Sequence, residues 1–289
     1  MEAIDFARRF GGVSRLYGEV GLSKLQAAHV CVVGIGGVGS WAAEALARNA
    51  VGNITLIDLD NIAESNVNRQ IHALESEFGK AKVTAMAQRI RAINPNAQVH
   101  EIEDFVTPEN INDALGPNIH GASGAPKIII DATDDVKAKI AMAVFCKQRN
   151  IPLIMAGGAG GRLDATKIKT ADLAHVAGDK LLAKVRNLLR RDFNFPKASN
   201  TKKSAKFGIV CVYSDEPILV PNEVCDTQID SNIKSDALQP NIHAAAGDAK
   251  ISRAITGLNC AGYGSSVCVT APFGFAAAQL AINHLLKSA

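Results

Sequence analysis

The stretch Gly34-Ile35-Gly36-Gly37-Val38-Gly39 decides the fold, because it joins a strand-like run to a helix-like run. Residues 30–33 before it are apolar and mostly β-branched, and residues 40–49 after it carry alanine and leucine at helical spacing. Glycines at this junction allow a tight turn, close approach of a phosphate and close helix packing. The helix N-terminus that follows favours an anion. The stretch therefore predicts a nucleotide-binding strand–turn–helix unit.

The same alternation continues along the chain. Further strands are expected at residues 54–57, 99–102, 127–130 and 152–155, and helices at 80–93 and 136–149. Strands that alternate with helices indicate an α/β fold, here a Rossmann-like, doubly wound and mostly parallel sheet. Right-handed crossovers would bring the carboxyl ends of these strands to one edge of the sheet.

After residue 161 the regular alternation of strand-like and helix-like segments stops. Residues 172–191 are expected to be helical, 197–206 a flexible polar loop, 207–213 a strand and 222–257 an irregular insertion. A closing strand at 267–270 and a helix at 273–286 would return this irregular extension to the sheet. We expect a single domain over residues 1–289. Its parts would be an N-terminal arginine element (1–28), a nucleotide-binding core (29–162), the basic helix, loop and insertion (163–260), and the closing strand and helix (261–289).

Composition is that of a soluble cytoplasmic enzyme. The chain has 289 residues, 47% of them hydrophobic, and a net charge of +3, which neither requires nor excludes nucleic acid. Residues 1–6 lack the apolar stretch of a secretory signal, and the apolar tail at 272–286 is interrupted by polar residues. No two of the six cysteines have C-x-x-C spacing, so a structural zinc site is not expected.

Several charged side chains come after the glycine stretch in the sequence. The acids lie where predicted strands end, and the basic residues lie on predicted helical segments. Asp58, Asp60 and Asp134 supply carboxylates, of which Asp60 and Asp134 could share one hard cation. Arg69 and Lys82 could neutralise phosphates. A pyrophosphate in a dinucleotide site is held largely by backbone amides and needs few of these groups. The set therefore favours a nucleoside triphosphate with magnesium over the commoner NAD site.

The sequence resembles the ubiquitin-activating-like adenylating superfamily, which activates carboxylates with ATP. The resemblance rests on Gly34-x-Gly36-Gly37-x-Gly39, Asp58-Leu59-Asp60, Ser65-Asn66-Val67-Asn68-Arg69-Gln70, Gly79-x-x-Lys82 and Asp131-Ala132-Thr133-Asp134. It implies that the glycine loop and Asp58 bind the nucleotide and its ribose. By the same resemblance Asn66, Arg69 and Lys82 would bind phosphates, and Asp60 and Asp134 would bind Mg²⁺.

The segment from Arg9 to Arg15 resembles the arginine element of this superfamily, whose arginine reaches the triphosphate of the partner subunit. The resemblance therefore implies a homodimer in which Arg15 acts on the partner's site. Together with residues 68–73, 157–161 and 270–275, this segment narrows the resemblance to the tRNA threonylcarbamoyladenosine dehydratase branch. That branch implies ATP-dependent cyclisation of threonylcarbamoyladenosine at position 37 of tRNA, through an acyl adenylate. A sulfur-transfer accessory protein is a further candidate partner.

Three other functions stay open at this point. The chain could adenylate the C-terminus of a ubiquitin-like sulfur-carrier protein, although the paired C-x-x-C ligands often found in that branch are missing. It could also be an NAD(P)-dependent oxidoreductase, or a binding module without catalytic activity. Transfer to an enzyme thiol would need a reactive cysteine, for which Cys211, Cys225 and Cys260 are the candidates, whereas Cys31 and Cys268 are expected to be packed.

The segment from 180 to 206 is strongly basic, with nine lysines and arginines and one acid. In isolation such a run is typical of a solvated helix face followed by a loop. With a tRNA substrate implied by the resemblance, the run becomes the candidate phosphate-contacting surface. Phe193 and Phe195 lie within it and either anchor the helix to the core or stack on a base.

Overall fold

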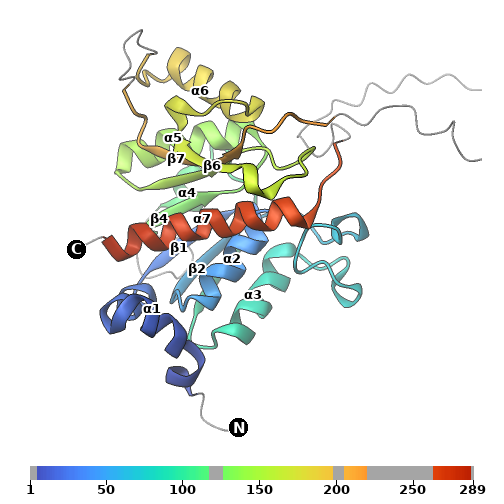
Figure 1. Cartoon of the computed structure of the whole chain (residues 1–289), viewed down its shortest axis with the longest axis vertical. Helices are drawn as coiled ribbons and strands as arrows, with labels where there is room; N and C mark the ends of the chain where they lie inside the picture. The colour runs from blue at the N-terminus through green and yellow to red at the C-terminus, as the bar shows by residue number, and fades with distance from the viewer. Residues whose placement is uncertain (1–4, 117–125, 198–204, 220–262, 288–289) are drawn as a thin grey trace, which may run out of the picture.

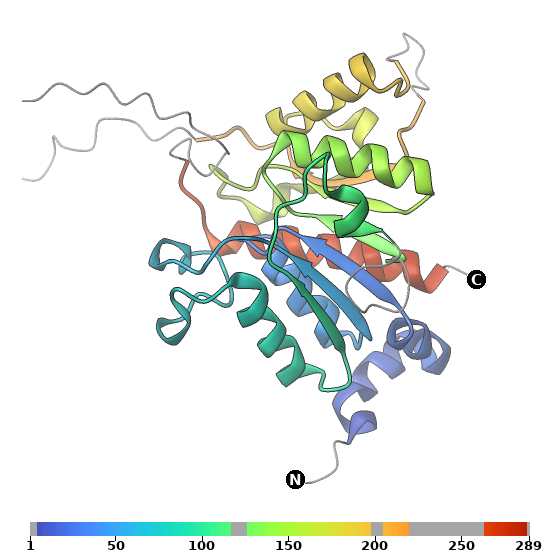
Figure 2. The ribbon, with the colours of Figure 1, turned by 180° about the vertical axis from the view of Figure 1, so that it is seen from behind.

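The computed structural model describes residues 5–116, 126–197, 205–219 and 263–287, which form a seven-stranded sheet covered by helices on both faces (Figures 1 and 2). The strands are β1 (His29–Val33), β2 (Asn53–Ile57), β3 (Gln98–Ile102), β4 (Ile128–Asp131), β5 (Leu153–Ala156), β6 (Ile168–Asp172) and β7 (Ile209–Ser214). The helices are α1 (Phe6–Gln26), α2 (Gly39–Arg48), α3 (Lys82–Ile93), α4 (Ile111–Leu115), α5 (Val136–Arg149), α6 (Lys180–Asp192) and α7 (Val267–Lys287).

The strand order is β3-β2-β1-β4-β5-β7-β6, and every neighbouring pair is parallel except β6 with β7. The order turns back at β1, which lies between β2 and β4. In register, Val33 at the end of β1 pairs with Ile57 of β2 and with Asp131 of β4. The loops that follow these three strands therefore begin side by side, at the kind of switch point where α/β sheets bind ligands.

The two faces of the sheet bury two separate cores. Val30 and Val32 of β1 pack with α2, α3 and α7, whereas the alternate residues Cys31 and Val33 pack with α4, α5 and α6. This alternation follows from the two-residue period of a strand. Near-continuous burial of β1 is typical of a parallel strand covered on both sides.

The predicted Rossmann-like, mostly parallel α/β sheet is confirmed, and the helix at 136–149 has the predicted bounds. Three elements were not expected, one of which is the short helix α4 between β3 and β4. Helix α1, which bends at Gly18, occupies most of the N-terminal segment, and the polar edge strand β6 begins at Ile168. The helix expected over 172–191 begins only at Lys180, where Asp179 caps it by accepting a hydrogen bond from the amide of Leu182.

The closing strand predicted at 267–270 was wrong, because these residues form the first turn of α7. Valine and threonine favoured a strand locally, but Ser266 caps a helix here. Its hydroxyl accepts from the amide of Cys268 at 3.2 Å, and its carbonyl accepts from Thr270 at 3.0 Å. Burial of Val269 and Thr270 against the sheet and α2 then outweighs the β propensity. Cys268, expected to be packed, is exposed at this turn, whereas Cys31 is buried as predicted.

Among the described residues, α7 is long and apolar enough to cross a bilayer, with a mean hydropathy of 1.2. However, 56% of its apolar window is buried in the protein. It crosses the sheet beside α2, as Figure 1 shows in red. These are the properties of a core helix.

Candidate active site

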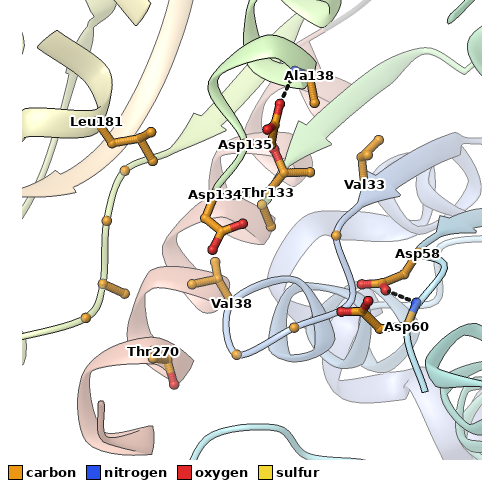
Figure 3. A pocket seen from close by; sticks show the side chains of 18 of the residues that line it. Val33, Val38, Asp58, Asp60, Thr133, Asp134, Asp135, Ala138, Leu181 and Thr270 are labelled. Atoms are coloured by element: carbon orange, nitrogen blue, oxygen red, sulfur yellow. Dashed lines mark hydrogen bonds between the residues drawn. The ribbon is translucent and has the colours of Figure 1, made fainter. Parts of the chain in front are cut away.

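A pocket of about 850 Å³ opens at the carboxyl edge of the parallel strands. It is lined by the loops that follow β1, β2, β3, β4 and β5 and by the first residues of α6 and α7 (Figure 3). This volume suits a ligand of nucleotide size. The sheet therefore brings together, around one cavity, segments that lie more than a hundred residues apart in the sequence.

The glycine loop forms the floor of this pocket. Gly34 takes a positive φ of 85°, and a side chain there would press on the backbone of Ala132 and Thr133. A Cβ on Gly39 would lie 1.8 Å from the carbonyl oxygen of Gly34, so α2 can start this close to β1 only with glycine. Gly34, Gly36 and Gly37 line the pocket, whereas Gly39 lies behind the loop and acts through packing.

Asp58 is fixed against the glycine loop immediately after β2. Its carboxylate accepts from the amide of Ile35 at 2.6 Å. It also accepts from the amide of Asp60 at 2.9 Å, as the dashed line in Figure 3 marks. Burial raises the pKa of Asp58, while the charge of Lys82 and these two amide donors oppose the rise. Asp58 is thus an oriented acceptor at the end of β2.

Lys82, the first residue of α3, is 5% exposed and lines the pocket beside two carboxylates. Its Nζ lies 2.6 Å from Asp60 Oδ2 and 3.8 Å from Asp58 Oδ1. A buried ammonium held by carboxylates is well placed to receive a phosphate group.

Asn66 and Arg69 project from the short helical turn after β2. The carbonyl oxygen of the Asn66 side chain accepts from the amide of Ala63 at 3.1 Å, which fixes the turn. Arg69 donates to the carbonyl of Ser65 at 2.8 Å, and its aliphatic stem lies against Gly37. Burial lowers the pKa of Arg69, and the negative charge of Asp134 counteracts this.

Asp134 reaches the pocket from the loop after β4, and Figure 3 shows it across the glycine loop from Asp58 and Asp60. Among the described residues, no cluster of three or more histidines, cysteines or acids is close enough to hold a metal ion. The Asp60 carboxylate is held by Lys82. The structure brings Asp60 and Asp134 to one pocket, and their sharing of a cation stays a prediction.

Arg15 does not reach the pocket of its own chain. It lies exposed on α1, which Figures 1 and 2 place at the far end of the sheet, beside the start of β1. The pocket lies at the opposite ends of the strands. If Arg15 contributes to a nucleotide site, that site must therefore belong to another molecule.

Sequence reasoning missed a second group, Arg162 and Asp179, which supports the other wall of the pocket. The Arg162 side chain is fully buried; its Nε donates to the carbonyl of Gly158 at 2.8 Å, and its guanidinium also contacts Asp179 and the carbonyl of Glu216. Asp179 accepts from the amide of Gly158 at 2.9 Å. The glycine run at 157–161 could have indicated this group, because so many glycines suggest that other groups pack closely against the backbone there.

Two further buried side chains line the pocket, Gln70 and Thr270. Within the part of the chain that the structure describes, the side-chain oxygen of each lacks a hydrogen-bond partner. An unpaired buried oxygen is costly, so these groups suit a polar ligand or an ordered water.

The buried cysteines among the described residues are poor candidates for a thiol intermediate. Burial raises the pKa of Cys211 and, to about 12, that of Cys146, which disfavours the thiolate. Cys211, one of the three candidates, is therefore a packed residue. The other two, Cys225 and Cys260, lie outside the described residues.

A model of the ThiF family matches residues 8–287. The chain is 43% identical to the tRNA threonylcarbamoyladenosine dehydratase of Escherichia coli K12, over 97% of this chain and 92% of that protein. It is 41% identical to the Haemophilus influenzae protein of the same name, over 99% and 97%. The crystal structure of the E. coli tRNA N6-threonylcarbamoyladenosine dehydratase in complex with ATP matches with a TM-score of 0.77 and 40% identity, over 99% and 97% of the two chains. The chain therefore belongs to the ThiF family, and within it to the tRNA threonylcarbamoyladenosine dehydratase branch.

Proposed function

We propose that this protein is an ATP-dependent enzyme that dehydrates N6-threonylcarbamoyladenosine at position 37 of tRNA. The observation that carries the proposal is the near-full-length similarity to the E. coli dehydratase, whose structure with ATP has the same fold. The pocket supports it independently, because it combines a glycine loop, an oriented acid and two cations at one switch point. ATP is the nucleotide that this combination suits.

The reaction would proceed in two steps. An oxygen of the threonyl carboxylate attacks the α-phosphorus of ATP, which forms an acyl adenylate and releases pyrophosphate. A nucleophile of the same modified side chain then attacks the acyl carbon, closes a ring and expels AMP. The net change is loss of water from the nucleoside, coupled to conversion of ATP into AMP and pyrophosphate.

The residues of the pocket have distinct tasks in this proposal. Asp58 accepts from the ribose hydroxyls, and Asn66 contacts the phosphates beside the glycine loop. Arg69 and Lys82 offset the repulsion between the carboxylate and the triphosphate, and they stabilise the charge that develops on phosphorus. Holding the substrate so that it attacks itself is a proximity effect and needs no enzyme thiol.

Magnesium is part of the proposal, with Asp134 as its protein ligand. Mg²⁺ commonly takes one or two carboxylates together with phosphate oxygens, and Asp134 has no salt bridge among the described residues. Asp60 would be a second ligand only by sharing its carboxylate with Lys82. When bound, the ion would neutralise charge on the phosphates.

We also propose a homodimer that places Arg15 in the partner's pocket. Leu16 and Val20 beside it on α1 are 71% and 73% exposed, and such apolar exposure is typical of an interface. A tRNA substrate implies a cytoplasmic enzyme. A sulfur-transfer accessory protein stays a prediction.

Mass spectrometry of tRNA nucleosides, before and after incubation with enzyme and ATP, tests the function. We expect threonylcarbamoyladenosine to lose about 18 Da, the mass of one water, with one AMP formed per product. The rival function is adenylation of a sulfur-carrier protein. An unchanged tRNA, together with an AMP adduct on the C-terminus of such a carrier, would replace our proposal with that one.

A further inference from the structure

Three exposed cations lie along one face of helix α6, starting at the pocket. Lys180, Lys184 and Arg191 are exposed and occupy positions i, i+4 and i+11, which fall on one face of a helix. The opposite face packs into the core through Leu182 and Leu189. We call these three cations the α6 stripe.

The remaining arginines of α6 have structural contacts instead. Arg186 donates to the carbonyls of Leu173 and Val176, and Arg190 donates to the carbonyl of Pro196 at 3.1 Å. The basic segment is thus divided: some of its cations brace the local backbone, and the α6 stripe faces solvent. Arg191 contacts Asp192 at 2.7 Å, but both side chains are exposed, so this pair holds the guanidinium weakly.

The α6 stripe begins at the active site. Lys180 lines the pocket, and its neighbour Leu181 is seen at the pocket wall in Figure 3. From Lys180 to Arg191 the helix rises about 17 Å, enough to span several nucleotides. Phe193, just beyond the end of the helix, is 43% exposed, whereas Phe195 is buried against Phe207. Phe193 follows Arg191 by two residues, so an exposed ring stands at the same end of α6 as the last cation, and such a ring can stack on an unpaired base.

We propose that the α6 stripe and Phe193 bind the RNA strand next to the nucleotide that enters the pocket. This inference rests on the proposed function and names the surface that recognises the substrate. RNA fits better than an acidic protein, because the cations lie along one helix face that starts at the pocket of the reacting nucleotide, and because an exposed aromatic ring stands at the far end of that helix. Salt-sensitive phosphate contacts then supply affinity, and the pocket supplies selectivity.

The test uses the full-length protein and tRNA that carries threonylcarbamoyladenosine. Equilibrium binding is measured over a range of salt concentrations for the wild type and the variant Lys184→Glu/Arg191→Glu. We expect tRNA binding at least about tenfold weaker in the variant, and a slope of log Kd against log salt smaller by roughly 0.7–0.9 per lost contact. Lys127→Glu is the control, because Lys127 is exposed just before β4, at the amino ends of the strands and so away from the pocket at their carboxyl ends. ATP binding should be unchanged in every variant.

Two outcomes would overturn the inference. One is wild-type affinity and salt slope in the double variant, and the other is an equal loss in Lys127→Glu. Weakened binding of a sulfur-transfer protein with unaltered tRNA binding would assign the stripe to a protein partner instead. Dehydration of tRNA by the wild type is measured in parallel. If the wild type does not dehydrate tRNA, the proposed function is refuted. If the wild type is active but the double variant binds tRNA as well as the wild type does, only this inference is refuted.

Discussion

Asp134 and Asp135 are adjacent acids that the structure gives different tasks. Asp135 caps α5, because its carboxylate accepts from the amide of Ala138 at 2.7 Å. Asp134 is turned into the pocket, where its charge acts on Arg69. The N-cap thus fixes the direction of the loop after β4 and presents the preceding carboxylate to the ligand.

Replacing Asp134 with Asn should lower turnover by roughly two orders of magnitude or more, the scale seen when a charge-stabilising group is removed. The variant keeps the size of the side chain but loses the charge that would hold the metal ion. The measurement is kcat for AMP formation with tRNA at saturating ATP. Asp135→Asn is the matched control, since asparagine also caps helices, and it should stay within about threefold of the wild type. Near-normal turnover in Asp134→Asn would remove Asp134 from the catalytic set.

How far the site could be predicted depends on where each residue's partners lie in the sequence. Asp58 and Asp134 follow predicted strands, and the predicted crossovers were enough to place them at one edge. Arg69 and Lys82 were expected on helical segments, and the family resemblance was needed to assign them to the same site. Arg162 could not be found in this way. Its contacts with Asp179 and Glu216 are 17 and 54 residues distant, and no local pattern links them. Both adjacent acids, Asp134 and Asp135, line the pocket, and only the cap shows that the Asp135 carboxylate is already engaged by α5.

At the scale of elements, the crossing of α7 over α2 shapes the glycine loop. The sequence pattern placed a closing helix at 273–286, but it could not show that the helix begins at Val267, since the Ser266 cap competes with a β-prone run. Asn68 ties this first turn to the segment that carries Asn66 and Arg69, because its carbonyl accepts from the amide of Val267 at 3.0 Å. Packing of α7 and geometry of the site are therefore coupled.

Gly274→Ala tests this coupling. A Cβ at Gly274 would lie 2.4 Å from the carbonyl oxygen of Val38 and 2.8 Å from Trp41 Cβ, so the helices must separate. We expect a loss of about 1–3 kcal/mol in the free energy of unfolding, together with a raised KM for ATP because Val38 belongs to the glycine loop. Urea unfolding and initial rates measure the two effects. At Gly264 a Cβ would meet nothing within 4 Å, so Gly264→Ala is the control. Equal behaviour of the two variants would contradict the coupling.

For the molecule as a whole, His72 links stability to pH. The ring is 2% exposed, and burial, followed by the charges of Lys82 and Arg89, lowers its pKa to about 4. Below its ordinary pKa of about 6.5 the unfolded chain takes up a proton that the folded chain refuses. Folding stability should therefore fall between pH 6.5 and 4, by about 3 kcal/mol from this group.

The measurement is the free energy of urea unfolding at several pH values for the wild type and His72→Leu. We expect the difference between the two to change across this window, because the leucine variant lacks the titrating ring. The control is His175→Leu, which alters an exposed histidine and should reproduce the wild-type pH dependence. A His72→Leu curve parallel to that of the wild type would show that the ring becomes protonated in the folded state.

The position of α1 leads to a test of the whole assembly. Arg15 is remote from its own pocket, so a catalytic role for it requires a second subunit. If Arg15→Ala and Asp134→Asn are coexpressed, a mixed dimer has one pocket with both residues intact. Random pairing makes half of the dimers mixed, each with one complete site out of two, so activity should recover to about a quarter of the wild type. Each variant alone should be nearly inactive.

The control for this experiment is a pair of variants whose defects lie in the same pocket. Lys82→Met coexpressed with Asp134→Asn leaves every site of a mixed dimer with one defect, since both residues line the pocket of a single chain. No recovery is expected there. Recovery in this control as well would mean that neither loss is confined to its own site. If coexpression with Arg15→Ala gives no recovery, Arg15 does not act on the pocket of the other subunit. The exposed surface of α1 would then have to bind a different partner.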